Sequence, residues 1–232
     1  MKVLAGTSGF SYKEWKGSFY PEKLANADML EFYSSKLPAV EINSTFYRMP
    51  KATVLDGWRE KVPASFRFIL KASRRITHFK RLKDAGDECK YFLDTARTLG
   101  DRLGAVLFQL PPNFKKDIDR LGGFLEVVPN DIRAAFEFRH ASWFDEDTYR
   151  LLRAHNRALC LAETEDETPE IVSTADWGYL RLRRPEYSEK ALAGWRQAIA
   201  ERGWSECFVF FKHEDEGSGP RLAEAFLRGH NT

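Results

Sequence analysis

The chain has 232 residues, of which 43% are hydrophobic and 30% charged, and its mean hydropathy is −0.48. This composition is typical of a soluble globular protein and excludes a disordered or membrane-embedded chain. The formal net charge is only +2. A dedicated nucleic-acid coat protein would have a strong positive field, so any electrostatic function has to be local.

The cysteines and the N-terminus indicate the compartment. Cys89, Cys160 and Cys207 are odd in number and form no C-x-x-C pair, so neither a disulfide framework nor a zinc knuckle is indicated. The apolar run before Gly6 is far too short for a signal sequence or a membrane span. We expect a cytoplasmic protein, with no membrane association and one domain over residues 1–232; two domains are the weaker alternative.

Short apolar runs alternate with longer amphipathic segments along the chain, which predicts repeated strand–helix units and a parallel sheet. The predicted strands are 2–6, 39–43, 66–71, 104–110, 133–139, 158–163, 178–183 and 207–212. The predicted helices are 27–37, 87–100, 117–128, 145–156, 188–203 and 219–229.

Eight such units predict an α/β fold of the compact TIM type, a (β/α)8 barrel in which some helices are short or missing. A doubly wound open sheet is the alternative. That fold would normally carry a glycine-rich phosphate loop after the first strand, but the "GTSG" at 6–9 has neither the G-x-G-x-x-G nor the Walker spacing.

Polar side chains close seven consecutive predicted strands. In "AVEINSTFYRMP", Glu41 and Asn43 share one parity of a strand whose other residues are apolar. Residues at the carboxyl ends of barrel strands line the mouth where ligands bind, so we expect the polar strand ends to form a paired network or to receive a charged ligand. They are Glu41, Asn43, Lys71, Gln109, Glu137, Arg139, Glu163, Arg181, Arg183 and Lys212.

Five motifs carry a resemblance to a known family. They are "GTSGFSYKEWKGSFYP", "EINSTFYRMP", "KASRRITH", "LFQLPPNF" and "FEFRHASWF", in this order along the chain. Together they resemble the DUF72 or YecE-like family. The resemblance implies a TIM-type barrel, distantly similar in shape to endonuclease IV and related sugar or phosphate enzymes, with no settled activity. The chain departs from the family where many relatives end the last strand with Phe-Asn-Asn, because Lys212 and His213 stand there.

Catalysis by carboxylates is one interpretation of the mouth. Hydrolysis of a glycosidic or phosphoester bond by paired carboxylates would use one carboxyl group with a raised pKa as the acid and another that stays ionised, and the candidate catalytic residues are Glu41, Glu137 and Glu163. Pairing of these carboxylates with Arg139 or Lys71 is an equally good reading of the same pattern.

No cofactor is expected from the sequence. Metal-assisted cleavage would need several ligands around an ion, and His78, His140 and His213 each follow a strand but show no metal-binding spacing. A divalent metal is a weak alternative.

Anion binding is the interpretation with the strongest electrostatic support. The segment "KASRRITHFKRLK" has six cations and no acid, and "RLRRP" adds three arginines. Arginine suits phosphate recognition, and neighbouring aromatic residues could stack on bases or sugars. The candidate ligand-binding residues are Asn43, Tyr47, Arg48, Lys71, His78, Gln109, Arg139, His140, Trp143, Arg181, Arg183 and Lys212.

The segment "FRHASWF" admits two readings. Arg139, His140 and Trp143 directly after a strand could clamp a ligand. Alternatively, Ser142 or Asp145 caps the next helix and Trp143 packs as a hydrophobic staple.

The sequence therefore predicts a barrel that binds, and in one version hydrolyses, a phosphate-containing ligand such as a nucleic-acid strand or a sugar phosphate. A non-catalytic nucleic-acid or protein-binding module is the competing hypothesis.

Overall fold

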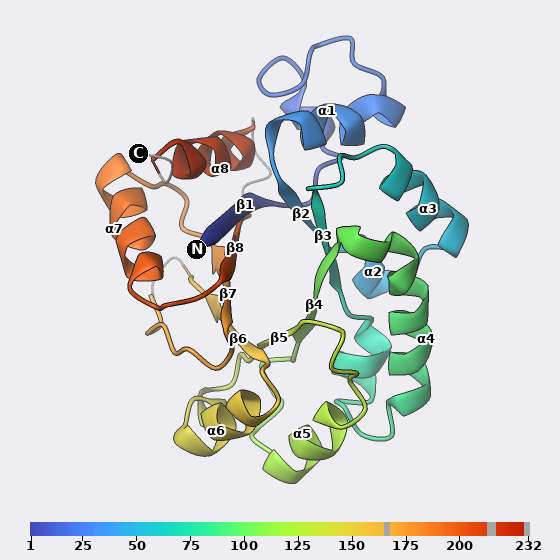
Figure 1. Ribbon diagram of the computed structural model, residues 1–232, viewed down its shortest axis with the longest axis vertical. Helices are drawn as coiled ribbons and strands as arrows, with labels where there is room; N and C mark the ends of the chain where they lie inside the picture. Colours follow the sequence, from blue (N-terminus) through green and yellow to red (C-terminus); the bar gives the residue numbers. More distant parts are fainter. Residues whose placement is uncertain (165–167, 213–216, 230–232) are drawn as a thin grey trace.

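Eight parallel strands form one closed barrel in the computed structural model, which describes residues 1–164, 168–212 and 217–229 (Figure 1). The strands pair in chain order, and β8 closes the barrel by pairing with β1. The predicted (β/α)8 fold and all eight predicted strands are confirmed. The strands are β1 (Lys2–Ser8), β2 (Ala39–Ile42), β3 (Arg67–Lys71), β4 (Leu103–Gln109), β5 (Ala134–Glu137), β6 (Ala158–Ala162), β7 (Trp177–Leu182) and β8 (Glu206–Phe211).

Helices surround the strands, and one connection lacks a helix in its described part. The helices are α1 (Met29–Lys36), α2 (Ser44–Tyr47), α3 (Ala52–Glu60), α4 (Gly86–Ala96), α5 (Ile118–Leu125), α6 (Glu146–Ala154), α7 (Glu189–Ala200) and α8 (Ser218–Arg228). The described residues between β6 and β7 form no helix. No described helix has both the length and the apolar character that crossing a bilayer would require.

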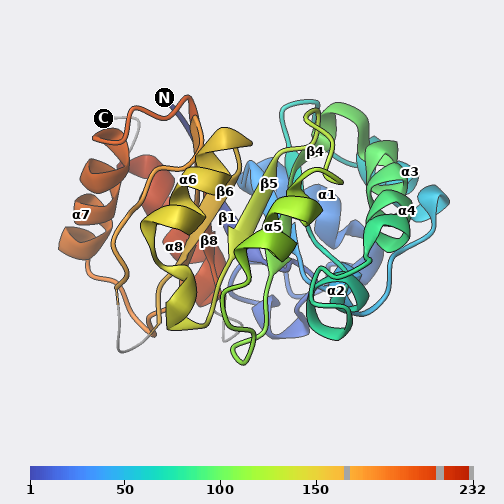
Figure 2. The same ribbon diagram turned by 90° about the horizontal axis from the view of Figure 1, so that it is seen from below.

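The six predicted helices are confirmed, and α2 and α3 are additional to them. Helix α2 is a single turn of four residues, too short to show a helical period, and α3 has nine residues and buries only Leu55. In Figure 2, α2 lies at the lower edge, opposite the N-terminus. Because α2 directly follows β2, that edge is the mouth of the barrel, where the strands end.

The core has two layers that follow from strand alternation. One cluster fills the inside of the barrel, and its members are Leu4, Ala39, Ile69, Ala105, Leu107, Ala135, Ala158, Cys160, Trp177, Tyr179, Phe208 and Phe210. The residues between them in each strand join the larger layer under the helices. Since the interior is filled by apolar side chains, the next inward residue of each strand emerges at the mouth.

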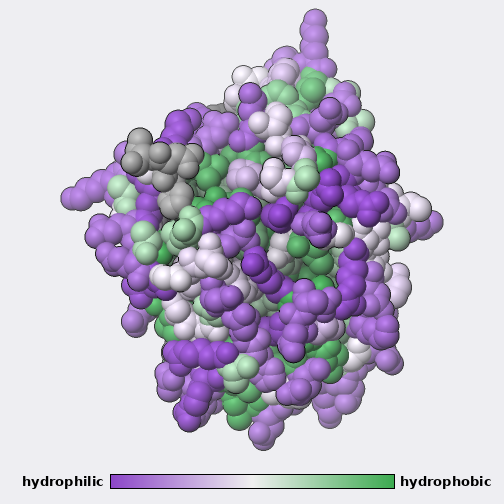
Figure 3. Space-filling model, in the orientation of Figure 1, coloured by the Kyte–Doolittle hydropathy of each residue, from purple (hydrophilic) through white to green (hydrophobic). Residues whose placement is uncertain are grey.

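The opposite end of the barrel, around the amino ends of the strands, faces the viewer in Figure 3. Hydrophilic side chains cover most of this face, and apolar atoms show between them. At the amino ends of the strands, Arg133, just before β5, pairs with Glu206, the first residue of β8, and their Nη1 and Oε2 atoms lie 2.5 Å apart. In barrels of this type such a face serves stability, and ligands bind at the mouth.

Gly6 provides a test of the barrel packing. A Cβ at Gly6 would lie 1.9 Å from the Ala39 carbonyl oxygen of the neighbouring strand, and that backbone atom cannot rotate away. Gly6→Ala should therefore lower the free energy of unfolding by about 1–3 kcal/mol. Urea titration measures this change.

Gly57→Ala is the matched control, because a Cβ at Gly57 in α3 would meet nothing within 4 Å. It should leave stability unchanged or raise it by up to about 1 kcal/mol. Equal stability of the two variants would contradict the close approach of β1 and β2.

Candidate functional site

A group of charged and polar side chains occupies the carboxyl ends of strands β2, β3, β4, β5 and β7. We call it the mouth cluster, and it consists of Glu41, Lys71, Gln109, Glu137, Arg139, Tyr179, Arg181 and Arg183. Seven of these eight residues were predicted from the sequence as ligand-binding or catalytic, and Tyr179 was not.

Arg181 joins two buried carboxylates across the barrel. Its Nη2 lies 2.7 Å from Oε1 of Glu41 on β2, and its Nη1 lies 2.5 Å from Oε2 of Glu137 on β5. All three side chains are buried. Two charge-assisted bonds from one planar guanidinium fix its orientation, so Arg181 is a rigid bridge between opposite sides of the mouth.

Glu41 is held by three groups. Besides Arg181, it accepts hydrogen bonds from the Tyr179 hydroxyl at 2.6 Å and from the Ser8 hydroxyl at 2.8 Å. The Ser8 bond comes from β1, the neighbour of β2. A buried polar group is stable when its hydrogen-bonding groups have partners. These three contacts therefore explain how a carboxylate can be buried in a core strand.

Glu137 is the most heavily paired carboxylate of the cluster. Its Oε1 accepts from Nε2 of Gln109 at 2.8 Å and from Nε of Arg139 at 3.3 Å, and Nη2 of Arg183 lies 3.6 Å away. With Arg181 on the other oxygen, four side chains converge on one carboxylate.

The charge states of the two carboxylates follow from these contacts. Burial by itself would raise the pKa of Glu41 and of Glu137, but the Arg181 charge and the surrounding hydrogen bonds outweigh it, and both pKa values are lowered. For Glu137, Arg183 and Arg139 add to the effect. Both groups are therefore ionised at neutral pH, and they suit the anchoring of cations better than the donation of protons.

The mouth cluster has more cations than these two carboxylates neutralise. Lys71, Arg139, Arg181 and Arg183 face Glu41 and Glu137, which leaves a surplus of two positive charges within the cluster. The side chain of Arg139 is 37% exposed and that of Arg183 is 19% exposed, whereas Arg181 is sealed below them. The surplus charge is thus on the accessible side.

Lys71 has no carboxylate within 4.0 Å among the described residues. Its Nζ lies 4.3 Å from the centre of the Phe46 ring, and the side chain is half-buried. Burial, reinforced by the charge of Arg181, lowers the pKa of Lys71 to about 8.

The third predicted catalytic residue, Glu163, belongs to a separate network. It follows β6 with the parity of Leu161, which packs in the layer outside the barrel. Its Oε1 lies 2.9 Å from Nε of Arg184 and accepts from the Thr168 hydroxyl at 3.0 Å, and its Oε2 accepts from the Tyr187 hydroxyl. The structure therefore separates Glu163 from the mouth cluster.

His140 and Trp143 take the local roles of the segment after β5. The His140 Nδ1 accepts from the Ser142 backbone N–H at 3.2 Å, and Asp145 caps α6 by accepting from the Thr148 N–H at 3.0 Å. Trp143 is fully buried, stacks on Phe138 and donates to the Phe114 carbonyl at 2.7 Å. Its ring is therefore not presented to the mouth.

The remaining predicted residues lie around the mouth. Asn43 is half-buried at the start of α2, and Lys212 is exposed directly after β8. His78 packs edge-on against Phe46, with the ring centres 4.8 Å apart. Burial and the charge of Lys71 lower the pKa of His78, so it is neutral at physiological pH. His213 lies outside the described residues.

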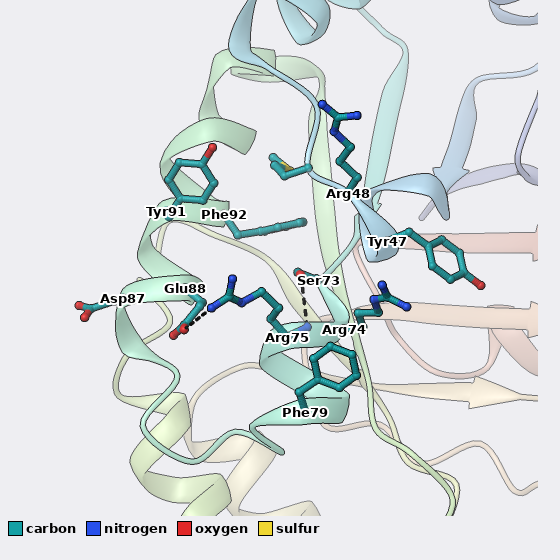
Figure 4. A pocket seen from close by; sticks show the side chains of 11 residues that line it. Tyr47, Arg48, Ser73, Arg74, Arg75, Phe79, Asp87, Glu88, Tyr91 and Phe92 are labelled. Atoms are coloured by element: carbon teal, nitrogen blue, oxygen red, sulfur yellow. Dashed lines mark hydrogen bonds and ion pairs between the residues drawn. The ribbon is translucent and has the colours of Figure 1, made fainter.

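Tyr47 and Arg48 line a pocket of about 560 Å³ beside the mouth (Figure 4). We call it the side pocket. Arg74 lies between the rings of Tyr47 and Phe79, at 5.7 and 5.4 Å from their centres. Tyr47 is 67% exposed and Phe79 is 69% exposed. Sequence reasoning found the basic residues here but missed Phe79, because nothing in "RRITHF" shows that this ring faces solvent.

No three-ligand metal cluster occurs in the part of the chain that the structure describes. Among residues 1–164, 168–212 and 217–229, no group of three or more His, Cys, Asp or Glu side chains is placed to hold an ion. The two described candidate histidines bond to neighbours instead: His78 to Thr77 and His140 to Ser142.

The contacts of Glu137 predict a large loss of stability when its charge is removed. Glu137→Gln leaves the buried Arg181 with one carboxylate instead of two, so we expect unfolding to be easier by about 3–5 kcal/mol at pH 7. Because the native pKa is lowered, this contribution is present above the ordinary value of 4.5 and is lost as the pH falls below it. Denaturant titration at pH 7 and pH 3.5 should show the difference from wild type shrinking in acid.

The control is Glu60→Gln, at an exposed position of α3, which should change stability by less than about 0.5 kcal/mol at both pH values. A pH-independent effect of Glu137→Gln would argue against an ionised Glu137.

Comparisons with known proteins identify the family. The profile of DUF72, a protein family of unknown function, matches residues 4–232. The chain is 26% identical over 215 residues to the UPF0759 protein YunF of Bacillus subtilis, covering 86% of this chain and 75% of YunF. It is 34% identical over 116 residues to the UPF0759 protein YecE of Escherichia coli K12, covering 50% of this chain and 43% of YecE. The crystal structure of a DUF72 family protein from Thermotoga maritima matches with a TM-score of 0.89 at 29% identity, covering 100% of both chains. Because the family profile matches nearly the whole length of the chain, the chain belongs to the DUF72 family, as its motifs predicted.

Proposed function

We propose that the mouth cluster binds the phosphate group of a ligand. The observation that supports this is the surplus of two positive charges on its accessible side, carried by Lys71, Arg139 and Arg183. The planar guanidinium matches the geometry of phosphate oxygens, and a partly buried site strengthens the interaction over that at an open surface.

Arg183 provides a second support. Its Nε is buried and has no hydrogen-bond partner within the described part of the chain. Buried donors are usually satisfied, and the Nε of Arg181 in the same cluster is also unpaired within the described residues, so the cluster keeps hydrogen-bonding capacity that a ligand oxygen or a water molecule can use. The Nη2 of the same guanidinium lies 3.6 Å from Glu137, which fixes the direction of the side chain.

Binding has more support than hydrolysis. A two-carboxylate hydrolase needs a carboxyl group that stays protonated at its working pH, and the pKa values of Glu41 and Glu137 are shifted the other way. Catalytic roles for these residues and for Glu163 stay predictions. Cytoplasmic location also belongs to this proposal, with Cys89, Cys160 and Cys207 all free and buried.

Glycerol 3-phosphate tests the site without any reactive group. Isothermal titration at low salt should show that wild type binds it and does not bind glycerol. Arg139→Gln and Arg183→Gln should each weaken binding about tenfold or more, since each removes a charge-assisted bond.

Arg150→Gln on α6, where Arg150 pairs with Asp147 at the surface, is the matched control and should bind normally. Equal affinity of all four proteins would overturn the assignment, as would failure of wild type to bind glycerol 3-phosphate or inorganic phosphate at low salt.

The side pocket favours a single nucleic-acid strand as a second candidate ligand. Tyr47 and Phe79 present exposed rings on either side of Arg74, and Arg48 lines the same pocket (Figure 4). Exposed aromatic rings beside arginines are the arrangement on which bases stack while phosphates are neutralised. These residues suit binding and include no catalytic group, so the side pocket is equally compatible with a non-catalytic binding module.

Fluorescence anisotropy with a short single-stranded oligonucleotide over a salt series separates the two kinds of contact. Arg74→Gln should weaken binding and lower the slope of log affinity against log salt by about 0.7. Tyr47→Ala and Phe79→Ala should weaken binding at an unchanged slope. Phe144→Ala, an exposed ring after β5, is the control. Absence of binding at low salt would exclude the strand and leave small phosphates.

A further inference from the structure

Lys71 is placed unlike the other lysines of the mouth region. It is the last residue of β3 and has the inward parity of Ile69, so it points into the barrel opening and not along its rim. The side chain is half-buried, and Lys212, at the corresponding end of β8, is exposed. A half-buried amine without a carboxylate within 4.0 Å in the described residues is unusual, because a lysine ammonium is normally solvated or paired.

The surroundings of Lys71 disfavour its protonated form. Arg181 and Arg139 are like charges, and Glu41 and Glu137, which oppose them, are already bound to arginines. With a pKa of about 8, roughly one tenth of the amine is neutral at pH 7, far more than for an exposed lysine. Desolvation and nearby cations both lower the pKa of a lysine, and a lysine with a lowered pKa is a better nucleophile at neutral pH.

His78 adds a proton carrier to the same place. Lys71 and His78 both pack on the ring of Phe46, at 4.3 and 4.8 Å. The His78 Nδ1 is engaged by the Thr77 hydroxyl at 2.9 Å, and its Nε2 has no partner in the described residues. Burial lowers the pKa of His78 and the charge of Lys71 lowers it further, so the two groups interact electrostatically. A neutral imidazole in this position can accept and return the protons that condensation with a carbonyl group requires.

We propose that Lys71 forms a Schiff base with the carbonyl carbon of a phosphate-bearing aldehyde or ketone. The proposal rests on the function proposed above, since Arg139 and Arg183 would hold the phosphate while the carbonyl group reaches the amine. The Lys71 nitrogen adds to the carbonyl carbon, and the carbonyl oxygen takes a proton to give a carbinolamine. The hydroxyl group then leaves as water while the nitrogen loses its remaining proton. One amine and one carbonyl compound thus give one imine and one water, and nothing is oxidised or reduced.

Reductive trapping tests the proposal. The protein is incubated with glyceraldehyde 3-phosphate and sodium cyanoborohydride, which reduces an imine to a stable secondary amine. Peptide mass mapping should find Lys71 modified at least tenfold faster than Lys190, an exposed lysine of α7. The rate at Lys71, measured with unphosphorylated glyceraldehyde, should rise with a midpoint near pH 8, the pKa of the amine.

Two variants separate the amine from the charge. Lys71→Arg keeps the positive charge but has no primary amine, so it should form no adduct at position 71 while Lys190 is still modified. Lys71→Met removes the amine and the positive charge. The variant protein should fold, because the substitution replaces an unpaired charge by an apolar side chain of similar length. Modification of Lys71 no faster than that of Lys190 would overturn the proposal.

The ligands also distinguish failure of this proposal from failure of the proposed function. Binding of glycerol 3-phosphate without selective trapping would leave the phosphate site in place and refute the Schiff base. Equal trapping rates with glyceraldehyde and glyceraldehyde 3-phosphate would support the reactive lysine and refute phosphate binding by the arginines. Faster trapping of the phosphorylated aldehyde, reduced by Arg139→Gln, would support both.

Discussion

The two ion pairs that Arg181 forms, with Glu41 and with Glu137, are the interactions on which the mouth of this barrel depends. They tie β7 to β2 and β5 across the opening, and both carboxylates are buried. Desolvating three charged groups is costly, and an apolar layer of equal volume would often be as stable or more stable. A network with this cost is therefore better explained by what it positions than by the stability that it adds.

What it positions are the cations above it. Glu137 accepts hydrogen bonds from Arg181 below and from Arg139 above, and it forms an ion pair with Arg183 at 3.6 Å. One carboxylate therefore orients two partly exposed arginines. Lys71 stands in the same opening but is left without such a partner among the described residues. In the function proposed above, this orientation preorganises the arginines for an anion, and the Lys71 amine is left for the proposed imine because the acidic groups are already occupied.

Much of this arrangement could be predicted from the sequence, and the reason is the strict alternation of barrel strands. A polar residue after an inward-facing apolar run has to emerge at the mouth, which places Glu41, Lys71, Gln109, Glu137 and Arg181 together despite their separation along the chain. The same rule explains Glu163. It lies one residue past the inward position Ala162, so it turns to the outer layer and to Arg184.

Features that depend on packing were not visible in the sequence. The ring of Trp143 could equally be a ligand clamp or a staple, and only the tertiary contacts with Phe114 and Phe138 bury it. The exposed ring of Phe79 next to Arg74 follows from the turn after β3, which no periodicity signals. Tyr179 reads as an interior barrel residue, and its hydroxyl becomes important only because Glu41 lies within 2.6 Å.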